Sequence, residues 1–242
     1  MIAIKIDNLT KKYRDVVAVD GLSLTIEEGE LFSLLGVNGA GKTTTVKMLT
    51  GLSKPTSGDA FLLGKSINTQ SNEVKELIAV SPQETAIAKG LTVRENLELI
   101  CGVCGFDKKK RAEKILSLCE LLGLEKILDR KSCKLSGGWQ RRLSIAMALI
   151  SEPKILFLDE PTLGLDVIAR SELWDVIRSL KGRVTVILTT HYMEEAEALS
   201  DRIAIMKDGR LLICDTAEAI KRLTDTDKFE EAFIRIVRGA LK

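Results

Sequence analysis

A glycine-rich stretch that follows an apolar run constrains this chain more than any other part of it. Residues 36–43 read Gly-Val-Asn-Gly-Ala-Gly-Lys-Thr and match the pattern G-x-x-x-x-G-K-[ST]. Leu31 to Leu35 before them are typical of a strand buried on both faces, and residues 43–52 after them predict a helix that ends near Gly51 and Pro55. In such a strand–loop–helix unit, the loop N–H groups and the helix N-terminus point at one anion. The segment therefore predicts a phosphate-binding loop.

The residue types in this loop predict which ligand it binds. Lys42 is suited to reach the β- and γ-phosphates of a nucleotide, and the Thr43 hydroxyl is suited to one position on Mg²⁺. No asparagine begins an Asn-Lys-x-Asp element, which guanine specificity usually requires, so GTP is disfavoured and ATP with Mg²⁺ is expected. The expected nucleotide contacts in the loop are Gly36, Asn38, Gly39, Ala40, Gly41, Lys42, Thr43 and Thr44.

An apolar strand farther along the chain ends in two carboxylates. Ile155 to Leu158 are followed directly by Asp159 and Glu160. A buried strand delivers such acids to the edge where α/β sheets bind ligands. Asp159 suits the Mg²⁺ shell, and Glu160 suits a general base that orients and deprotonates the attacking water. A surface acidic turn before Pro161 is the alternative, but the phosphate-binding loop upstream favours the catalytic interpretation.

Residues 135–140, which read Leu-Ser-Gly-Gly-Trp-Gln, make the chain resemble the ATP-binding-cassette (ABC) ATPases, whose signature is Leu-Ser-Gly-Gly-x-Gln. The resemblance covers nearly the whole chain. It implies that Gln83 contacts Mg²⁺ and water and senses a transmembrane partner, and that His191 contacts the γ-phosphate. Tyr13 falls where the family stacks an aromatic ring on adenine, and residues 164–166 resemble the D-loop. A purely structural role is the alternative for His191 and for Tyr13.

The signature also has a physical interpretation. Ser136 opens a helix, predicted over about residues 139–150, whose N–H groups form a second anion site that two glycines let a ligand approach closely. The resemblance implies that two subunits sandwich two ATP molecules, each signature capping the other subunit's γ-phosphate. The contacts expected from this segment are Ser136, Gly137, Gly138 and Gln140. Val37, where proline is frequent in the family, and Trp139, where a smaller residue is usual, remove no phosphate donor.

Strand and helix patterns alternate in both outer parts of the chain and enclose a helical block. Residues 1–6 and 22–26 alternate like strands, and residues 203–206 and 211–213 flank an Asp-Gly hairpin signal. A strand over 155–158, a helix over 166–180 and a strand over 184–189 are also predicted. In the block, Thr92 and Glu95 form a capping-box pattern, and an apolar stripe at 115, 118, 119 and 122 stops at Gly123.

This order of elements predicts an α/β parallel-sheet core with a helical insertion. The resemblance specifies a P-loop NTPase (RecA-like) core, an N-terminal antiparallel β subdomain and an inserted α-helical subdomain. We expect residues 1–242 to form a single ABC ATPase domain. Its expected parts are the ATP-binding core with the β subdomain at 1–85 and 153–215, the helical signature subdomain at 86–152, and a C-terminal helical tail at 216–242.

Charge and composition exclude several classes of function. The 36 basic and 34 acidic residues nearly balance, so we expect no nucleic-acid partner, and the basic run at 108–111 reads as a solvated helix face. No apolar stretch approaches the ~20 residues that cross a bilayer, and the N-terminus lacks signal-peptide features. The expected location is therefore cytoplasmic, peripheral on the inner face of the membrane. Cys101 and Cys104 are interpreted as small helix-core residues rather than a metal or redox site.

The resemblance finally suggests which kind of ABC protein this is. A single cassette without a spanning segment fits an ATPase subunit that works with a separately encoded membrane permease, paired with a second copy of itself or with a paralogous subunit. Residues 91–97 and 229–233 resemble the bacterial drug, antibiotic and lipid exporter branch. An importer subunit is the closer alternative, and a soluble ABC ATPase of translation or DNA repair the more distant one.

Overall fold

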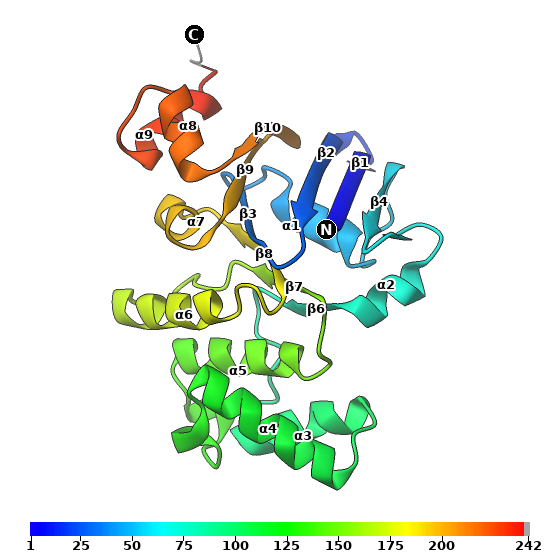
Figure 1. Ribbon diagram of the computed structural model, residues 1–242, viewed down its shortest axis with the longest axis vertical. Helices are drawn as coiled ribbons and strands as arrows, with labels where there is room; N and C mark the ends of the chain where they lie inside the picture. The colour runs from blue at the N-terminus through cyan, green and yellow to red at the C-terminus, as the bar shows by residue number, and fades with distance from the viewer. Residues whose placement is uncertain (240–242) are drawn as a thin grey trace.

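Two β-sheets lie against each other in the upper part of the molecule, and a block of helices extends below them (Figure 1). The computed structural model describes residues 1–239. The antiparallel sheet has the strand order β2-β1-β4-β5, and the larger sheet has the order β10-β9-β3-β8-β7-β6. The strands of the first sheet are β1 (Ile2–Tyr13), β2 (Val16–Glu27), β4 (Ser57–Leu62) and β5 (Lys65–Ser66). Those of the second are β3 (Leu31–Leu35), β6 (Ile78–Ser81), β7 (Ile155–Asp159), β8 (Thr185–Thr190), β9 (Arg202–Lys207) and β10 (Arg210–Asp215).

The larger sheet is parallel from β9 to β6, and β10 is added antiparallel at one edge through the predicted hairpin. Its central strands are buried along their whole length, as the short apolar runs predict. Along β7 alternate side chains enter different cores because successive residues of a strand point to opposite faces. Ile155 and Phe157 pack toward the antiparallel sheet and α1 (Lys42–Leu49), whereas Leu156 and Leu158 pack toward the helical block.

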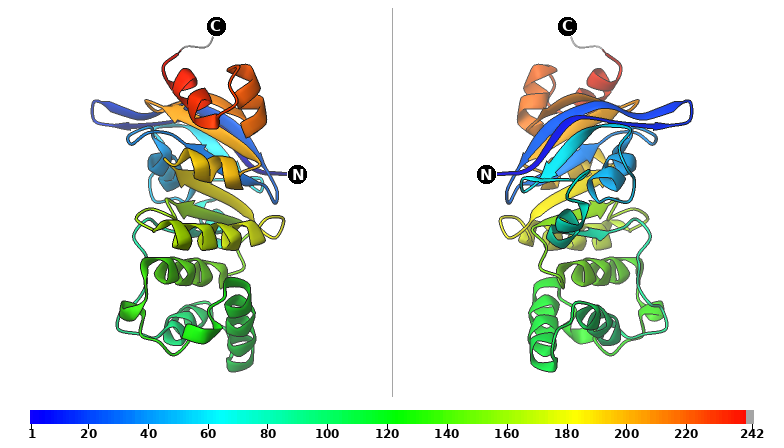
Figure 2. Two further views of the ribbon diagram at one scale, coloured as in Figure 1. Left: turned by 90° about the vertical axis from the view of Figure 1, so that its left-hand side faces the viewer. Right: turned by 90° about the vertical axis from the view of Figure 1, so that its right-hand side faces the viewer.

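Helices complete both sides of the parallel sheet (Figure 2). Helix α5 (Gly137–Leu149) and α6 (Val167–Ser179) pack beside its lower strands, and α3 (Val93–Val103) and α4 (Lys108–Leu122) follow below them. Helix α7 (Met193–Leu199) with the tail helices α8 (Ala217–Leu223) and α9 (Phe229–Val237) buries a separate cluster against β3 and β9. The short helix α2 (Ser71–Leu77) connects the two sheets.

The predicted fold class is confirmed by this architecture, although several boundaries move. Helix α1 begins one residue earlier than expected and ends at Leu49, before the positive φ of Gly51. Helix α5 also starts two residues earlier, at Gly137. Among the strands and α-helices of residues 1–239, five were not predicted: β4, β5, α2, β6 and α7. The tail contains helices as expected, the last of which ends at Val237, and residues 240–242 of the expected tail lie outside the described residues.

The cysteine interpretation is half right. Cys101 is buried in the core of the helical block, and burial raises the pKa of its thiol. Cys104 is instead exposed, because α3 ends at Val103 and Cys104 is its C-cap. The stripe on α4 is buried as predicted and ends at Gly123 in the left-handed conformation. Within residues 1–239 no helix is both long and apolar enough to cross a membrane.

The start of α3 forms the predicted capping box. Thr92 Oγ1 accepts a hydrogen bond from the Glu95 backbone N–H at 3.1 Å, and the Glu95 carboxylate accepts one from the Thr92 N–H at 2.6 Å. These hydrogen bonds hold the pKa of Glu95 below its usual range. Two backbone donors that the first helical turn leaves without partners are thereby satisfied.

We expect Thr92→Ala to lower the free energy of unfolding by about 1 kcal/mol, since it removes the acceptor for the first turn of α3. Thr92→Ser is the matched control, because it keeps the hydroxyl and should retain most of the stability. Urea denaturation followed by circular dichroism measures both changes. Equal stability of the alanine and serine variants would contradict a stabilising role for this cap.

Candidate functional site

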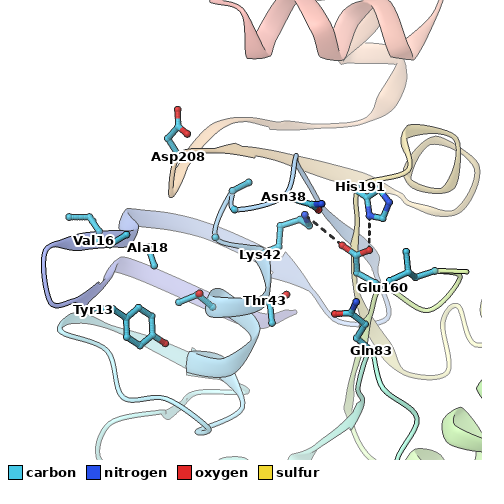
Figure 3. A pocket seen from close by; sticks show the side chains of 16 residues that line it. Tyr13, Val16, Ala18, Asn38, Lys42, Thr43, Gln83, Glu160, His191 and Asp208 are labelled. Carbon is cyan, nitrogen blue, oxygen red and sulfur yellow. Dashed lines mark hydrogen bonds and ion pairs between the residues drawn. The ribbon is translucent and has the colours of Figure 1, made fainter.

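A pocket of about 770 Å³ lies between the phosphate-binding loop and the ends of the parallel strands (Figure 3). Its floor is the loop of residues 36–43 at the start of α1, and its side wall comes from the residues that follow β6, β7 and β8. The lining residues are Tyr13, Val16, Val17, Ala18, Asn38, Gly39, Ala40, Gly41, Lys42, Thr43, Thr44, Gln83, Glu160, Leu163, His191 and Asp208. Most of the predicted loop and catalytic residues therefore face one cavity.

The loop is packed so closely against the β9–β10 hairpin and against β2 that two of its glycines cannot be replaced without strain. A Cβ on Gly36 would lie 2.4 Å from the Met206 carbonyl oxygen. Gly41 has a φ of 101° and lies against the Ala18 carbonyl, at 2.6 Å from where a Cβ would be. The Gly209 N–H also donates to the Ala40 carbonyl. The hairpin thus fixes the position of the loop at the pocket. Gly36 itself is not part of the lining.

Lys42 is almost entirely buried and lies at the centre of the loop. Its Nζ donates to the carbonyls of Gly36 at 2.8 Å and Val37 at 3.3 Å, and lies 3.8 Å from Glu160 Oε1. Burial lowers the pKa of the Lys42 ammonium, and the nearby carboxylates of Glu160 and Asp159 oppose that shift. The ammonium is therefore fixed beside the loop, where a phosphate would provide a stronger counter-charge than the carbonyls do.

Asp159, the last residue of β7, lies below the loop rather than in the pocket lining. Its Oδ1 accepts hydrogen bonds from Thr43 Oγ1 at 3.3 Å and from the Thr189 hydroxyl on β8. The side chain is 7% exposed. The register that pairs Asp159 with Thr189 produces this contact. Hydroxyl and carboxylate oxygens of the kind that Mg²⁺ prefers thus meet where the start of α1 faces the end of β7.

Glu160 and His191 lie together at the edge of the pocket, each just after the end of a neighbouring strand. His191 Nδ1 is 2.6 Å from Glu160 Oε2. Glu160 has a φ of 49°, a left-handed conformation that is unusual for this residue type, and its N–H donates to the Thr189 carbonyl. This turn directs the carboxylate into the pocket while Asp159 stays buried. Figure 3 shows Glu160 between Lys42 and His191, with Gln83 beside it.

The opposite end of the pocket is less polar. Tyr13, the last residue of β1, is 46% exposed, and its hydroxyl lies 3.3 Å from Ser53 Oγ. Val16, Val17 and Ala18 on β2 extend this wall. These three residues, Leu163 and Asp208 were not predicted as site residues. The Asp-Gly hairpin signal was available for Asp208, but its place at the pocket depends on β9 pairing with β3.

The four signature residues are not in the lining of this pocket. Ser136 is the N-cap of α5, and its side chain makes no capping hydrogen bond. The adjoining glycines allow close packing on α6: a Cβ on Gly138 would lie 3.1 Å from Ala169 Cβ, and one on Gly137 would lie 3.2 Å from Leu165 Cδ2. Gln140 Nε2 donates to the Leu135 carbonyl at 3.0 Å. This group forms a second surface, separate from the pocket.

Comparison with known proteins agrees with the fold. Residues 19–163 match the family described as ABC transporter, and residues 133–196 also match one described as an AAA domain, putative AbiEii toxin, Type IV TA system. The Nod factor export ATP-binding protein I of Rhizobium sp. (strain N33) is 43% identical over 212 residues, covering 87% of this chain and 70% of that protein. The phospholipid-transporting ATPase ABCA3 of Homo sapiens is 42% identical over 223 residues, which cover 90% of this chain.

A solved structure described as a dimeric post-hydrolysis state of an ATP-binding cassette, bound to ADP and Pi, superposes with a TM-score of 0.77 at 28% identity. That alignment covers 88% of this chain and 98% of the other. The architecture is that of a P-loop NTPase. The chain belongs to the ABC transporter family, as the ATP-binding cassette of such a protein. It spans 13% of the length of ABCA3.

Proposed function

We propose that this chain is the ATP-hydrolysing motor subunit of an ABC transporter, and that the transporter exports its substrate through a separate membrane permease. The convergence of Lys42, Glu160 and His191 on one pocket, above a phosphate-binding loop, carries this proposal. It unites a phosphate-binding cation, a carboxylate base and a polar ring within reach of the same terminal phosphate. The export direction draws support from the printed name of one relative, the Nod factor export ATP-binding protein I.

ATP would lie along the pocket with its base near Tyr13 and its phosphates on the loop. The Tyr13 ring is half exposed and can stack on adenine, beside the apolar wall of Val16 and Ala18. The N–H groups of residues 38–44 and the N-terminus of α1 provide the phosphate donors. Lys42 then exchanges its neighbour Glu160 for the β- and γ-phosphates, which frees the carboxylate for a water molecule.

The residues that meet at the start of α1 fit Mg²⁺. Thr43 and Asp159 present hard oxygen atoms that already lie 3.3 Å apart, and Gln83 adds an amide oxygen from the pocket wall. We propose that these three side chains hold the ion together with the nucleotide phosphates. When bound, Mg²⁺ would neutralise charge on the β- and γ-phosphates. Asp159 keeps its orientation toward this position through the Thr189 hydroxyl.

Hydrolysis requires a water molecule aligned with the γ-phosphate. Glu160 is suited to accept its proton, because its backbone turn directs the carboxylate into the pocket. An ionised carboxylate only accepts hydrogen bonds, so this contact requires a proton on His191 Nδ1, with the Nδ1–H donating a hydrogen bond to Glu160 Oε2. That bond fixes the imidazole. To contact the γ-phosphate through Nε2, His191 would carry a second proton there, because phosphate oxygens only accept hydrogen bonds. Gln83, which lies beside Glu160 on the same side wall, orients the same water.

The second surface supports a complete site made by two subunits. Ser136, Gly137, Gly138 and Gln140 lie outside the pocket, at the N-terminus of α5 and beside the D-loop. Val167 and Ile168, at the start of α6 next to this surface, are 78% and 73% exposed. The similar cassette solved as a dimer gives a precedent for covering such a surface. We propose that two copies, or this chain and a paralogue, bind two ATP molecules between signature and loop, and that hydrolysis separates them.

The membrane partner is proposed from the family and from the relatives' names. We propose a separately encoded integral membrane permease, with this chain bound at the inner face of the membrane. Residues 86–152 would form the subdomain that moves against the core when ATP binds. An importer subunit is the second candidate. The balance of 36 basic and 34 acidic residues disfavours a nucleic-acid partner.

We expect Glu160→Gln to reduce ATP turnover by about 10²-fold or more while leaving the affinity for ATP intact, because an amide cannot accept the proton of water. Lys42→Ala is the comparison, since it removes a phosphate contact and should weaken binding itself. Steady-state phosphate release gives turnover, and calorimetry gives affinity. Near-normal hydrolysis by the Glu160→Gln protein would remove Glu160 from the role of general base.

The same Glu160→Gln variant should dimerise with ATP and Mg²⁺ and remain monomeric with ADP, as measured by light scattering. Ser136→Asp in that background is the matched control. Aspartate is also a good N-cap, so α5 should persist, but its charge would repel the γ-phosphate of the opposite subunit. We therefore expect the double variant to stay monomeric. A mass that does not respond to nucleotide, or a dimer that tolerates Ser136→Asp, would contradict the sandwich arrangement.

The transporter role is tested by recovering tagged Glu160→Gln protein from detergent-solubilised host membranes in the presence of ATP. Mass spectrometry should identify a stoichiometric protein with several membrane spans, whose own sequence would indicate direction and substrate. The Lys42→Ala variant controls for nucleotide dependence. Recovery of ribosomal or DNA-bound proteins without a membrane protein would contradict the transporter role and leave the ATPase chemistry standing.

A further inference from the structure

A buried arginine that sequence analysis did not single out joins the signature helix to the loop that carries Gln83. Arg141 lies on the second turn of α5, and only 6% of its surface is exposed. Its Nη1 donates to the Pro82 carbonyl at 2.6 Å, and its Nη2 donates to the Gln83 carbonyl at 2.7 Å. The flat guanidinium fork thus holds two successive peptide groups at once, which a lysine ammonium cannot do in the same geometry.

A second contact lies one helical turn farther along the same face of α5. The hydroxyls of Ser144 and Ser81 are 2.9 Å apart and buried. Positions three apart on a helix are neighbours on its surface, so Arg141 and Ser144 form one continuous strip against the end of β6. The chain leaves β6 at Ser81, so the carbonyls of Pro82 and Gln83 have no partner in the sheet. The Arg141 guanidinium supplies the hydrogen bonds that these carbonyls need.

The charged guanidinium of Arg141 donates its hydrogen bonds to uncharged groups. Within residues 1–239 Arg141 forms no ion pair, and its two side-chain hydrogen bonds go to the neutral carbonyl groups of Pro82 and Gln83. Burial lowers the pKa of the guanidinium, and the negative charges of Asp159 and Glu195 oppose this. A cation buried at such a cost in solvation is a poor source of stability by comparison with an apolar side chain. Its value is geometric: it defines where the backbone of Gln83 lies.

We propose that Arg141 is a positioning residue that couples the orientation of α5 to the placement of Gln83 in the pocket. The inference rests on the proposed function, because it concerns the same nucleotide site. The helix that holds the Gln83 backbone also carries Ser136 at its N-terminus, so a tilt of α5 moves the signature surface and Gln83 together. An ATP molecule bound across two subunits would then align Gln83 in one subunit when it contacts Ser136 of that subunit.

The test uses Arg141→Lys in the full chain, with Arg142→Lys as the matched control. Arg142 is the next residue of α5, but its guanidinium pairs with Glu172 at 2.7 Å and lies over the Trp139 ring, away from Gln83. We expect Arg141→Lys to lower kcat by about 10- to 10²-fold with nearly unchanged ATP affinity, the size of effect that a misplaced catalytic group produces. Arg142→Lys should retain the parental kcat.

A double-mutant cycle separates positioning from a general loss of structure. Gln83→Ala should itself lower kcat, and adding Arg141→Lys should cause no further loss, since both changes remove the same contribution. Additive losses, or equal losses in Arg142→Lys, would overturn the proposal. If Arg141→Lys does not fold, Ser144→Ala is the alternative variant, because it removes the hydroxyl contact with Ser81 on the same face of α5. It should also lower kcat. A folded Ser144→Ala protein with the parental kcat would overturn the proposal.

Hydrogen exchange tests the contact without reference to activity. Deuterium uptake by peptides covering residues 82–90 should rise in Arg141→Lys and stay at the parental level in Arg142→Lys. Unchanged uptake would overturn the proposal even if ATP hydrolysis is confirmed. A parental protein that does not hydrolyse ATP would instead contradict the proposed function, and the exchange measurement would still decide whether Arg141 holds the loop.

Discussion

The parallel pairing of β7 with β8 is the constraint on which the chemistry of this molecule depends. Its register sets Asp159 beside Thr189, so that the two strands end at the same level. One hydroxyl then orients Asp159 beneath the loop, and the backbone of the same threonine accepts a hydrogen bond from Glu160. His191 follows two residues later and meets the Glu160 carboxylate. A shift of one residue would turn these side chains to the opposite face of the sheet.

The floor of the pocket, formed by the loop before α1, and the wall that contains Gln83 are held by different parts of the molecule. Helix α1 is packed between the two sheets through Val46, Met48 and Leu49, which leaves the loop at its N-terminus little freedom. Gln83 instead lies on a segment held from below by α5. The nucleotide site is therefore assembled from parts that belong to different hydrophobic clusters, and ligands at such a junction can respond to movement between them.

Sequence predicted the elements that have a strong local signal. The phosphate-binding loop, the buried strands and the capping box of Thr92 are each defined within a few residues, and all were found in place. The short elements α2 and β5 lack enough residues to show a period, and they form because the sheets around them supply partners. Arg141 could not be recognised because the groups it holds lie 58 and 59 positions away in the chain. Cys104 was misassigned because the end of α3 moved it out of the core.

Because Gly137 and Gly138 have no side chains, the start of α5 lies close to the segment that follows Glu160. Without a Cβ at Gly138, α5 approaches Ala169 on α6 at contact distance, and Leu165 covers Gly137. The signature surface is therefore in direct contact with the D-loop through Leu165 and with the start of α6 through Ala169. A displacement of the helical block toward the core would press on Leu165 and Ala169 first, close in the chain to Glu160. We therefore expect the D-loop to be the first part of the core that responds when the helical block shifts.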